Sequence, residues 1–185
     1  MLGEQRSPPC LTLLLGGSRS GKSQLGEALI EEEATRTGVD AAYIATAEAF
    51  DQDMRDRIAA HIARRSSPWR PMPWHTVEEP RDLAGALTST AEALVLVDCL
   101  SMWLYNLIQA AADISSETEK LLAGLKARTL PTVLISSEVG LGIVPDTQMW
   151  RRFRDEQGRV NQQVAAVADC VALMVAGLPI RAKPR

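Results

Sequence analysis

The sequence of 185 residues has few aromatic side chains, only three cysteines and no long apolar run. Aromatic residues make up 4% of the chain, which argues against a platform for stacking nucleic-acid bases. The cysteines at positions 10, 99 and 170 are too scattered for a disulfide framework, and no two have the CxxC spacing of a thiolate metal site. No apolar run approaches the roughly 20 residues that cross a bilayer, and prolines interrupt the N-terminal segment where a signal peptide needs an apolar core. We therefore expect a cytoplasmic protein without a membrane span.

The charge balance excludes further classes of protein. Lys and Arg number 20 against 23 Asp and Glu, so the net charge of -3 lacks the positive field of a dedicated nucleic-acid binder. Apolar residues at 46% and charged residues at 23% are globular proportions and do not fit a disordered chain, a collagen-like repeat or a coiled coil. The length predicts one domain over residues 1–185, with flexible tails at 1–9 and 181–185.

Short apolar runs alternate with longer helical patterns along the chain. Because most of the runs are apolar throughout, they are typical of parallel strands that are covered on both faces. The pattern predicts an α/β fold with a mostly parallel sheet and helices on both faces. Residues 64–76, which are rich in proline, are predicted to form a surface loop that includes His75. The predicted strands are 11–15, 42–46, 94–98, 132–137 and 171–176, and the predicted helices are 22–37, 51–65, 80–93, 100–112, 116–128 and 146–168.

A glycine-rich segment, GGSRSGKS, follows the first predicted strand and precedes a helix. It fits G-x-x-x-x-G-K-[ST] in the strand–loop–helix context of a phosphate-binding P-loop. The glycines let successive backbone amides point into one concavity, and the helix adds the positive end of its dipole. Lysine supplies a charge for the terminal phosphates and the last serine a hydroxyl for Mg²⁺. The predicted nucleotide contacts are Gly16, Gly17, Ser18, Arg19, Ser20, Gly21, Lys22 and Ser23, with Lys22 also catalytic.

Asp98 ends the apolar strand LVLVD. In other proteins with this loop, a carboxylate at the end of a strand holds Mg²⁺ directly or through water, so Asp98 and Ser23 are the predicted metal ligands. The alternative is that Asp98 caps the helix that follows. Together with the phosphate loop, the carboxylate predicts a nucleoside triphosphate with Mg²⁺ and does not define the reaction.

His61 is one of two histidines and lies on a predicted helix among arginines at 57, 64 and 65. Positions three and four apart share one helix face, so the imidazole lies within a stripe of guanidinium groups. Nearby positive charge lowers a histidine pKa and keeps the ring neutral and nucleophilic. The stripe alone leaves open a histidine at the edge of the core beside solvated arginines.

Four segments now carry a resemblance to a known family. They are GGSRSGKS, YIATAEAFDQDMRDRIAAHIARR, VDCLSMWLYNLI and SSEVGLGIVPDTQMWRRFRDEQGRVNQQVAAVAD, in this order. The sequence resembles the bifunctional adenosylcobinamide kinase / adenosylcobinamide-phosphate guanylyltransferase family of cobalamin biosynthesis over nearly the whole chain. The resemblance implies a RecA-like P-loop fold and a homotrimer. It also implies phosphorylation of adenosylcobinamide by ATP or GTP, and then transfer of GMP from GTP through a guanylyl-histidine to give adenosylcobinamide-GDP and pyrophosphate.

The resemblance also assigns site residues. His61 matches the histidine that carries GMP, and Asp98 stands where some members have glutamate. The loop over residues 66–75 is longer than is usual in the family, so either Glu78 or Glu79 matches a nucleotide contact. The remaining nucleotide contacts that it implies are Ala45, Thr46, Ala47, Ile62, Ala63, Arg64 and Arg65.

Glu138, Gly140 and Gly142 follow the strand predicted at 132–137 directly. Ligands of open α/β sheets bind at such carboxyl ends, so Glu138 is a candidate base for the corrinoid hydroxyl or an indirect metal ligand, and the glycines allow a bulky substrate to approach. The alternative is a tight turn with a capping glutamate. Asp146 is predicted to cap the next helix. Arg154, Asp155, Arg159 and Asn161 either shape the site or form a subunit contact.

Two other functions compete with the bifunctional enzyme. A monofunctional P-loop kinase for another small alcohol or nucleotide would have no use for His61. A non-catalytic GTP or ATP switch would form no covalent adduct. The residues themselves do not choose between ATP and GTP for the kinase step, and they do not identify the corrinoid contacts.

Overall fold

The computed structural model of the chain describes residues 10–49, 52–65 and 73–183. Its centre is a seven-stranded sheet in the order β3-β2-β4-β5-β1-β6-β7, in which every neighbouring pair is parallel except β6 and β7. Strand β5 therefore lies between β1, which leads into the phosphate loop, and β4, which ends at Asp98. The strands are β1 (Leu11–Gly16), β2 (Ala41–Ala45), β3 (Trp74–Glu78), β4 (Leu94–Asp98), β5 (Thr132–Ser137), β6 (Cys170–Val175) and β7 (Leu178–Lys183).

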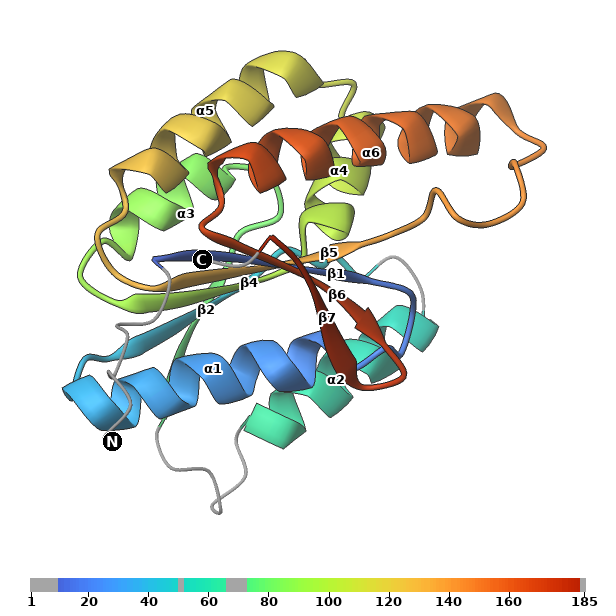
Figure 1. Ribbon diagram of the computed structural model, residues 1–185. Helices are drawn as coiled ribbons and strands as arrows, with labels where there is room; N and C mark the ends of the chain where they lie inside the picture. The colour runs from blue at the N-terminus through green and yellow to red at the C-terminus, as the bar shows by residue number, and fades with distance from the viewer. Residues whose placement is uncertain (1–9, 50–51, 66–72, 184–185) are drawn as a thin grey trace.

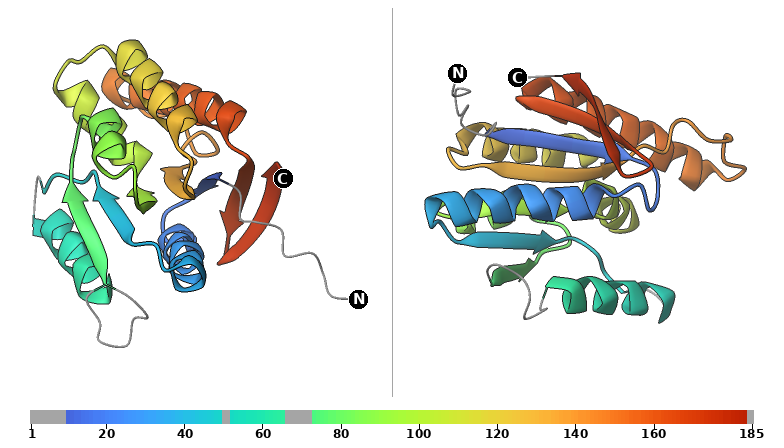
Figure 2. Two further views of the ribbon diagram at one scale, coloured as in Figure 1. Left: turned by 90° about the vertical axis from the view of Figure 1, so that its left-hand side faces the viewer. Right: turned by 60° about the horizontal axis from the view of Figure 1, so that its bottom comes forward.

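Helices cover both faces of the sheet (Figures 1 and 2), with α1 and α2 on one face and α3 to α6 on the other. This arrangement is the predicted α/β, P-loop type of fold. None of the helices in the described residues has the length and apolar character needed to cross a membrane. The helices are α1 (Lys22–Thr37), α2 (Gln52–Arg65), α3 (Leu83–Ser89), α4 (Leu100–Gln109), α5 (Ile114–Ala127) and α6 (Gln148–Val167).

Two apolar clusters fill the space between the helices and the sheet. Adjacent strand residues point to opposite faces, so Leu13 joins the cluster under α3 to α6, whereas Leu14 joins the one under α1. Trp103 of α4 is almost fully buried in the first cluster, and its indole nitrogen donates to the Arg81 carbonyl at 2.8 Å. Burial on both faces explains why these strands are continuously apolar in sequence.

The structure corrects the sequence prediction at four places. Residues 74–76 belong to strand β3, an edge strand, and not to a loop, although His75 is exposed as expected. Arg181 to Lys183 belong to β7 and are not a tail, whereas residues 1–9 and 184–185 lie outside the described residues. Helix α3 spans seven residues of the predicted 80–93. Helix α6 is capped by Thr147, whose hydroxyl accepts from the Trp150 amide, and not by Asp146.

Candidate nucleotide-binding site

The phosphate loop turns between β1 and α1 through backbone conformations that favour glycine. Gly16 and Gly21 have φ of 151° and 97°, and Arg19 between them has φ of 55°. A Cβ on Gly16 would lie 2.8 Å from the Met174 carbonyl oxygen of β6, so the loop begins in close backbone contact with the neighbouring strand. The Ser20 carbonyl accepts from the Gly177 amide at 3.0 Å. The β6–β7 turn therefore supports the loop from one side.

Lys22 lies at the first position of α1 and is 9% exposed. Its ammonium group donates to the carbonyl oxygens of Gly16 and Gly17 at 2.8 and 2.6 Å. Burial lowers the pKa of Lys22, and the nearby Cys99 and Asp98 partly oppose this effect. An ammonium group has three donors, so one remains for a phosphate oxygen.

Asp98 lies where two hydroxyl groups converge. The hydroxyls of Ser23 and Tyr43 each donate to Asp98 Oδ2 at 2.8 Å, which joins the start of α1 and the middle of β2 to the end of β4. The N-cap residue of α4 is Cys99 and not Asp98, and its side chain makes no capping hydrogen bond. The alternative in which Asp98 caps this helix is therefore wrong. Burial raises the pKa of the Cys99 thiol to about 12, which keeps it protonated beside this carboxylate.

The oxygen atoms at Asp98 fit Mg²⁺. This ion is usually bound by one or two carboxylates together with the phosphates of its substrate, rather than by a cage of protein ligands. Among the described residues no group of three or more His, Cys, Asp or Glu could form such a cage. The Ser23 hydroxyl and the Asp98 carboxylate, in contact beside the phosphate loop, are the hard oxygen donors that a magnesium–nucleotide complex needs.

The segment after β2 is fixed to the start of α4. The Thr46 hydroxyl donates to the Cys99 carbonyl at 2.7 Å and accepts from the Cys99 amide at 2.8 Å, while the Thr46 amide donates to the Asp98 carbonyl at 3.2 Å. Thr46 is fully buried and its neighbours Ala45 and Ala47 are half-buried. The predicted contact segment therefore lies beside Asp98, at the same edge of the sheet as the phosphate loop.

Glu78 and Glu79 end β3 at this edge. The Glu79 amide donates to the Ala45 carbonyl at 2.9 Å, and its carboxylate accepts from the amides of Arg81 and Asp82 at 2.9 and 2.8 Å. Glu78 is exposed. Of the two alternatives, Glu79 is thus already engaged in a turn, which leaves Glu78 as the better candidate for a nucleotide contact.

Glu138 begins the connection from β5 to α6. Its amide donates to the Gly16 carbonyl at 3.1 Å, so this connection starts at the phosphate loop, and its carboxylate accepts from the Gly140 amide at 2.8 Å. The tight-turn alternative is therefore present in the structure, and the backbone of Glu138 adjoins the phosphate loop. Gly142 is exposed, and the Arg154 guanidinium donates to the Gly140 carbonyl at 2.9 Å.

A buried polar network supports the end of β5. The Ser136 hydroxyl donates to Asn161 Oδ1 at 2.6 Å, and the Gln157 amide donates to both Ser136 and Asn161. The Asn161 amide in turn donates to the Ser137 carbonyl at 3.1 Å. Asn161 thus supports the end of β5, from which Glu138 follows.

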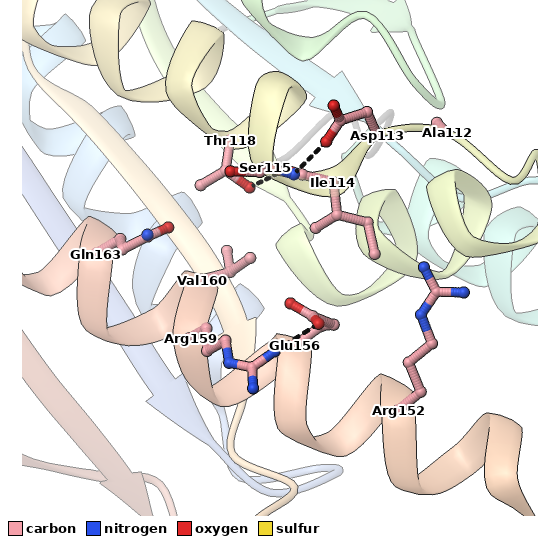
Figure 3. Close-up of a pocket in the computed structure, with 10 residues that line it drawn as sticks. All are labelled: Ala112, Asp113, Ile114, Ser115, Thr118, Arg152, Glu156, Arg159, Val160 and Gln163. Atoms are coloured by element: carbon pink, nitrogen blue, oxygen red, sulfur yellow. Dashed lines mark hydrogen bonds and ion pairs between the residues drawn. The ribbon is translucent and has the colours of Figure 1, made fainter.

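Arg159 lies elsewhere. It pairs with Glu156 at 2.6 Å and lines a hollow of about 380 Å³ between the start of α5 and helix α6 (Figure 3). Arg152 lines the same hollow from α6, and Thr118 lines it from α5. None of the phosphate-loop residues lines it. Asp155, on the same helix, is exposed.

His61 lies on α2, on the same side of the sheet as α1 (Figure 1). The side chains of His61, Arg64 and Arg65 lie outside the described part of the structure. Ile62 and Ala63 are described, and both are exposed. The predicted proximity of the imidazole to a nucleotide therefore stays a prediction.

The sequence patterns did not single out three residues of the site: Tyr43, Ser101 and Asn106. Ser101 of α4 accepts from the Ser137 amide at 2.8 Å, and Asn106 binds the segment after β2. Tyr43 lies inside an apolar strand, where its hydroxyl gave no local signal. Polar residues inside the apolar helix LSMWLYNLIQ are the one signal that could have marked Ser101 and Asn106.

Comparisons with known proteins agree with this geometry. The family model described as cobinamide kinase / cobinamide phosphate guanyltransferase matches residues 12–182. The bifunctional adenosylcobalamin biosynthesis protein CobP of Pseudomonas aeruginosa is 45% identical over 175 residues, which cover 92% of this chain and 96% of that protein. The bifunctional adenosylcobalamin biosynthesis protein CobU of Escherichia coli is 35% identical, with coverage of 94% and 99%, and that of Salmonella typhimurium is 34% identical with the same coverage. The chain belongs to the cobinamide kinase / cobinamide phosphate guanyltransferase family.

Proposed function

We propose that this protein carries out two reactions at one nucleotide site, in a single domain. It phosphorylates the hydroxyl of adenosylcobinamide with ATP or GTP. It then transfers GMP from GTP to adenosylcobinamide phosphate, which releases pyrophosphate and yields adenosylcobinamide-GDP. Family membership supports the two activities. The single observation that carries the proposal is the contact of Ser23 at the start of α1 with Asp98 at the end of β4, directly beside the phosphate loop.

In the kinase step the phosphate loop binds and orients the triphosphate. The amides of residues 17–21 and the start of α1 surround the β and γ phosphates, and Lys22 adds a positive charge from a buried position. Ser23 and Asp98 would hold Mg²⁺, which would neutralise part of the phosphate charge. Glu138 accepts the proton of the corrinoid hydroxyl while the hydroxyl oxygen bonds to the γ-phosphorus; the bond from that phosphorus to the β–γ bridging oxygen breaks, and the nucleoside diphosphate leaves.

In the transfer step His61 is the nucleophile. A ring nitrogen of the neutral imidazole attacks the α-phosphorus of GTP, so that an N–P bond forms, the bond from phosphorus to the bridging oxygen breaks and pyrophosphate leaves. A phosphate oxygen of adenosylcobinamide phosphate then attacks the same phosphorus, and the N–P bond breaks to regenerate His61. The positive charge of Arg64 and Arg65 favours the neutral ring and binds phosphate oxygens.

The contacts outside the triphosphate come from the segments after β2, α2 and β3. Residues 45–47 and Glu78 lie at the carboxyl ends of β2 and β3, the same end of the strands as the phosphate loop. Ile62 and Ala63 follow His61 on α2, and both are exposed in this structure. We assign all of them to nucleotide binding. We also infer a cytoplasmic homotrimer, and sedimentation of the purified protein at equilibrium tests the trimer.

The test is covalent labelling with α-³²P-GTP and Mg²⁺, followed by denaturation and gel autoradiography. Wild type is compared with His61→Ala and with the matched control His75→Ala, which replaces the only other histidine of the chain. We expect a label that is labile in acid and stable in alkali, present in wild type and His75→Ala and absent from His61→Ala. Tight GTP binding without any label would refute the histidine route and favour a monofunctional kinase or a switch.

The kinase half is tested separately with γ-³²P-ATP or γ-³²P-GTP and adenosylcobinamide. We expect transfer of label to the corrinoid in wild type and in His61→Ala, because the first step does not use the imidazole. Turnover in neither protein, together with slow hydrolysis of the nucleotide, would instead support the switch.

A further inference from the structure

The side chain of Asn106 connects two segments of the candidate site, the one after β2 and the one after β3. It lies on α4 and is 2% exposed. Its amide nitrogen donates to the Thr46 carbonyl at 2.7 Å and to the Pro80 carbonyl at 3.0 Å. Both partners are acceptors only, so the two contacts fix which end of the side-chain amide is nitrogen. The amide oxygen has no hydrogen-bond partner in the described structure, so the side chain is held through its donors alone.

The two carbonyls belong to neighbouring connections at the carboxyl edge of the sheet. Thr46 follows β2 and Pro80 follows β3, and these strands pair in parallel with Ala45 opposite Glu78. Between the described residues of these two connections, one further backbone bond continues the β2–β3 pairing, from the Glu79 amide to the Ala45 carbonyl. Asn106 therefore joins these two connecting segments just beyond the ends of β2 and β3, where the strand pairing stops.

Further hydrogen bonds join the Thr46 segment to the phosphate side of the site. The Thr46 hydroxyl exchanges two hydrogen bonds with Cys99, the residue after Asp98. A displacement of Thr46 would therefore be transmitted to the carboxylate that contacts Ser23. Asn106 lies two turns along α4 from Cys99. Its amide contacts the backbone of Thr46 and Pro80, so any effect on the nucleotide must pass through these two residues.

We propose that Asn106 is a positioning residue for the nucleotide, which sets the separation of the Thr46 and Glu78 segments and thereby the affinity for GTP. This inference rests on the proposed function in assigning those segments to nucleotide binding. It predicts that loss of the two amide donors weakens GTP binding more than it slows the chemical steps once the nucleotide is bound.

The informative variant is Asn106→Asp, which keeps the shape of the side chain and replaces the donor nitrogen by oxygen. Arg128→Met is the matched control. The Arg128 guanidinium also donates to backbone carbonyls, those of Leu87, Thr90 and Ala93, but at the opposite edge of the sheet, where β4 and β5 begin. Both variants lose side-chain donors to main-chain oxygens, and only Asn106→Asp loses donors beside the site.

The dissociation constant for GTP with Mg²⁺ is measured by titration calorimetry, the stability by urea unfolding, and KM and kcat by release of pyrophosphate. We expect Asn106→Asp, which removes both amide donors, to raise the dissociation constant and KM for GTP by about tenfold and to change kcat less, because Asn106 acts on the nucleotide only through the Thr46 and Pro80 segments. Arg128→Met should lose stability and keep the wild-type dissociation constant. Should Asn106→Asp not fold, the smaller Asn106→Ser, which keeps a hydroxyl donor, is measured in the same way, with a smaller expected increase.

Normal GTP affinity in a folded Asn106 variant would overturn the inference. Equal losses of affinity in the Asn106 and Arg128 variants would also overturn it, because they would show a general effect of stability. Titration with GTP needs no corrinoid, so the inference is tested even if wild type makes no adenosylcobinamide-GDP and the proposed function fails. A wild type that binds neither GTP nor ATP would refute both.

Discussion

Replacement of Gly26 by alanine tests how closely α1 must approach the sheet. A Cβ at this position would lie 2.8 Å from Leu96 Cδ1, 3.4 Å from Ile135 Cδ1 and 3.5 Å from Val133 Cγ1. Carbon atoms prefer about 3.5 to 4.0 Å, so the side chain of the fully buried Leu96 must shift within the core to accept the new methyl group. Overpacking of this kind costs about 1 to 3 kcal/mol, against a gain of about 1 kcal/mol from the better helix propensity of alanine. We expect Gly26→Ala to lower the free energy of unfolding by up to about 2 kcal/mol.

The matched control is Gly124→Ala on α5. There the nearest atom to a new Cβ is Leu87 Cδ1 at 3.6 Å, an ordinary contact, so the propensity gain is not opposed and stability should rise by about 1 kcal/mol. Urea unfolding of both variants beside wild type measures the two effects. Because α1 begins with Lys22 and Ser23, an outward shift of the helix in Gly26→Ala should also weaken GTP binding, whereas Gly124→Ala should not. Stabilisation of both variants by the same amount would refute the packing argument.

Three further predictions concern charged and titrating groups. Asp98→Asn should keep the fold and raise the Mg²⁺ concentration at half-maximal kinase activity by about 10- to 100-fold, because the proposed magnesium site would lose its carboxylate; an unchanged requirement would remove Asp98 from that proposed site. Arg128→Met should lower the free energy of unfolding by about 2 to 3 kcal/mol, because it leaves carbonyls without donors, and urea unfolding measures this loss. Burial raises the pKa of Cys99 from 9.0 to about 12, so the folded protein retains a proton that the unfolded chain releases above pH 9. The stability from this group is therefore complete below pH 9 and declines as the pH rises toward 12, and Cys99→Ser should show a flatter alkaline decline in thermal melts than wild type.

The sequence predicted the centre of the fold well because its strands are buried on both faces. Strands β1, β4 and β5 carry continuous apolar runs, and their predicted positions agree with the structure to within one residue. The two missed strands lie at the edges of the sheet. Strand β3 follows a proline-rich segment and has only two half-buried residues among its five, and all six residues of β7 are exposed. An edge strand has one neighbour and little burial, so its sequence carries a weaker signal.

The same distinction holds within the site. The phosphate loop and Asp98 could be found because each is marked locally, by glycine spacing and by a charge at the end of an apolar strand. The partners Tyr43 and Asn106 could not, because their polar atoms gain meaning only from chains brought together by the fold. The choice between Glu78 and Glu79 likewise depended on a turn, in which Glu79 accepts from two backbone amides.

The position of β1 in the sheet has a consequence for the order in which the protein is made. Its neighbours are β5 and β6, and Thr12 pairs with Val133 on one side and Cys170 on the other. During synthesis, β1 and the glycine loop leave the ribosome well before β5 and β6. Strand β1 can therefore pair with both neighbours only when nearly all of the sequence has been made. Pairings this distant in sequence form slowly because a long loop must close first. We expect ribosome-bound chains that stop before β6 to bind no nucleotide, so that the first motif to be synthesised is the last to become functional.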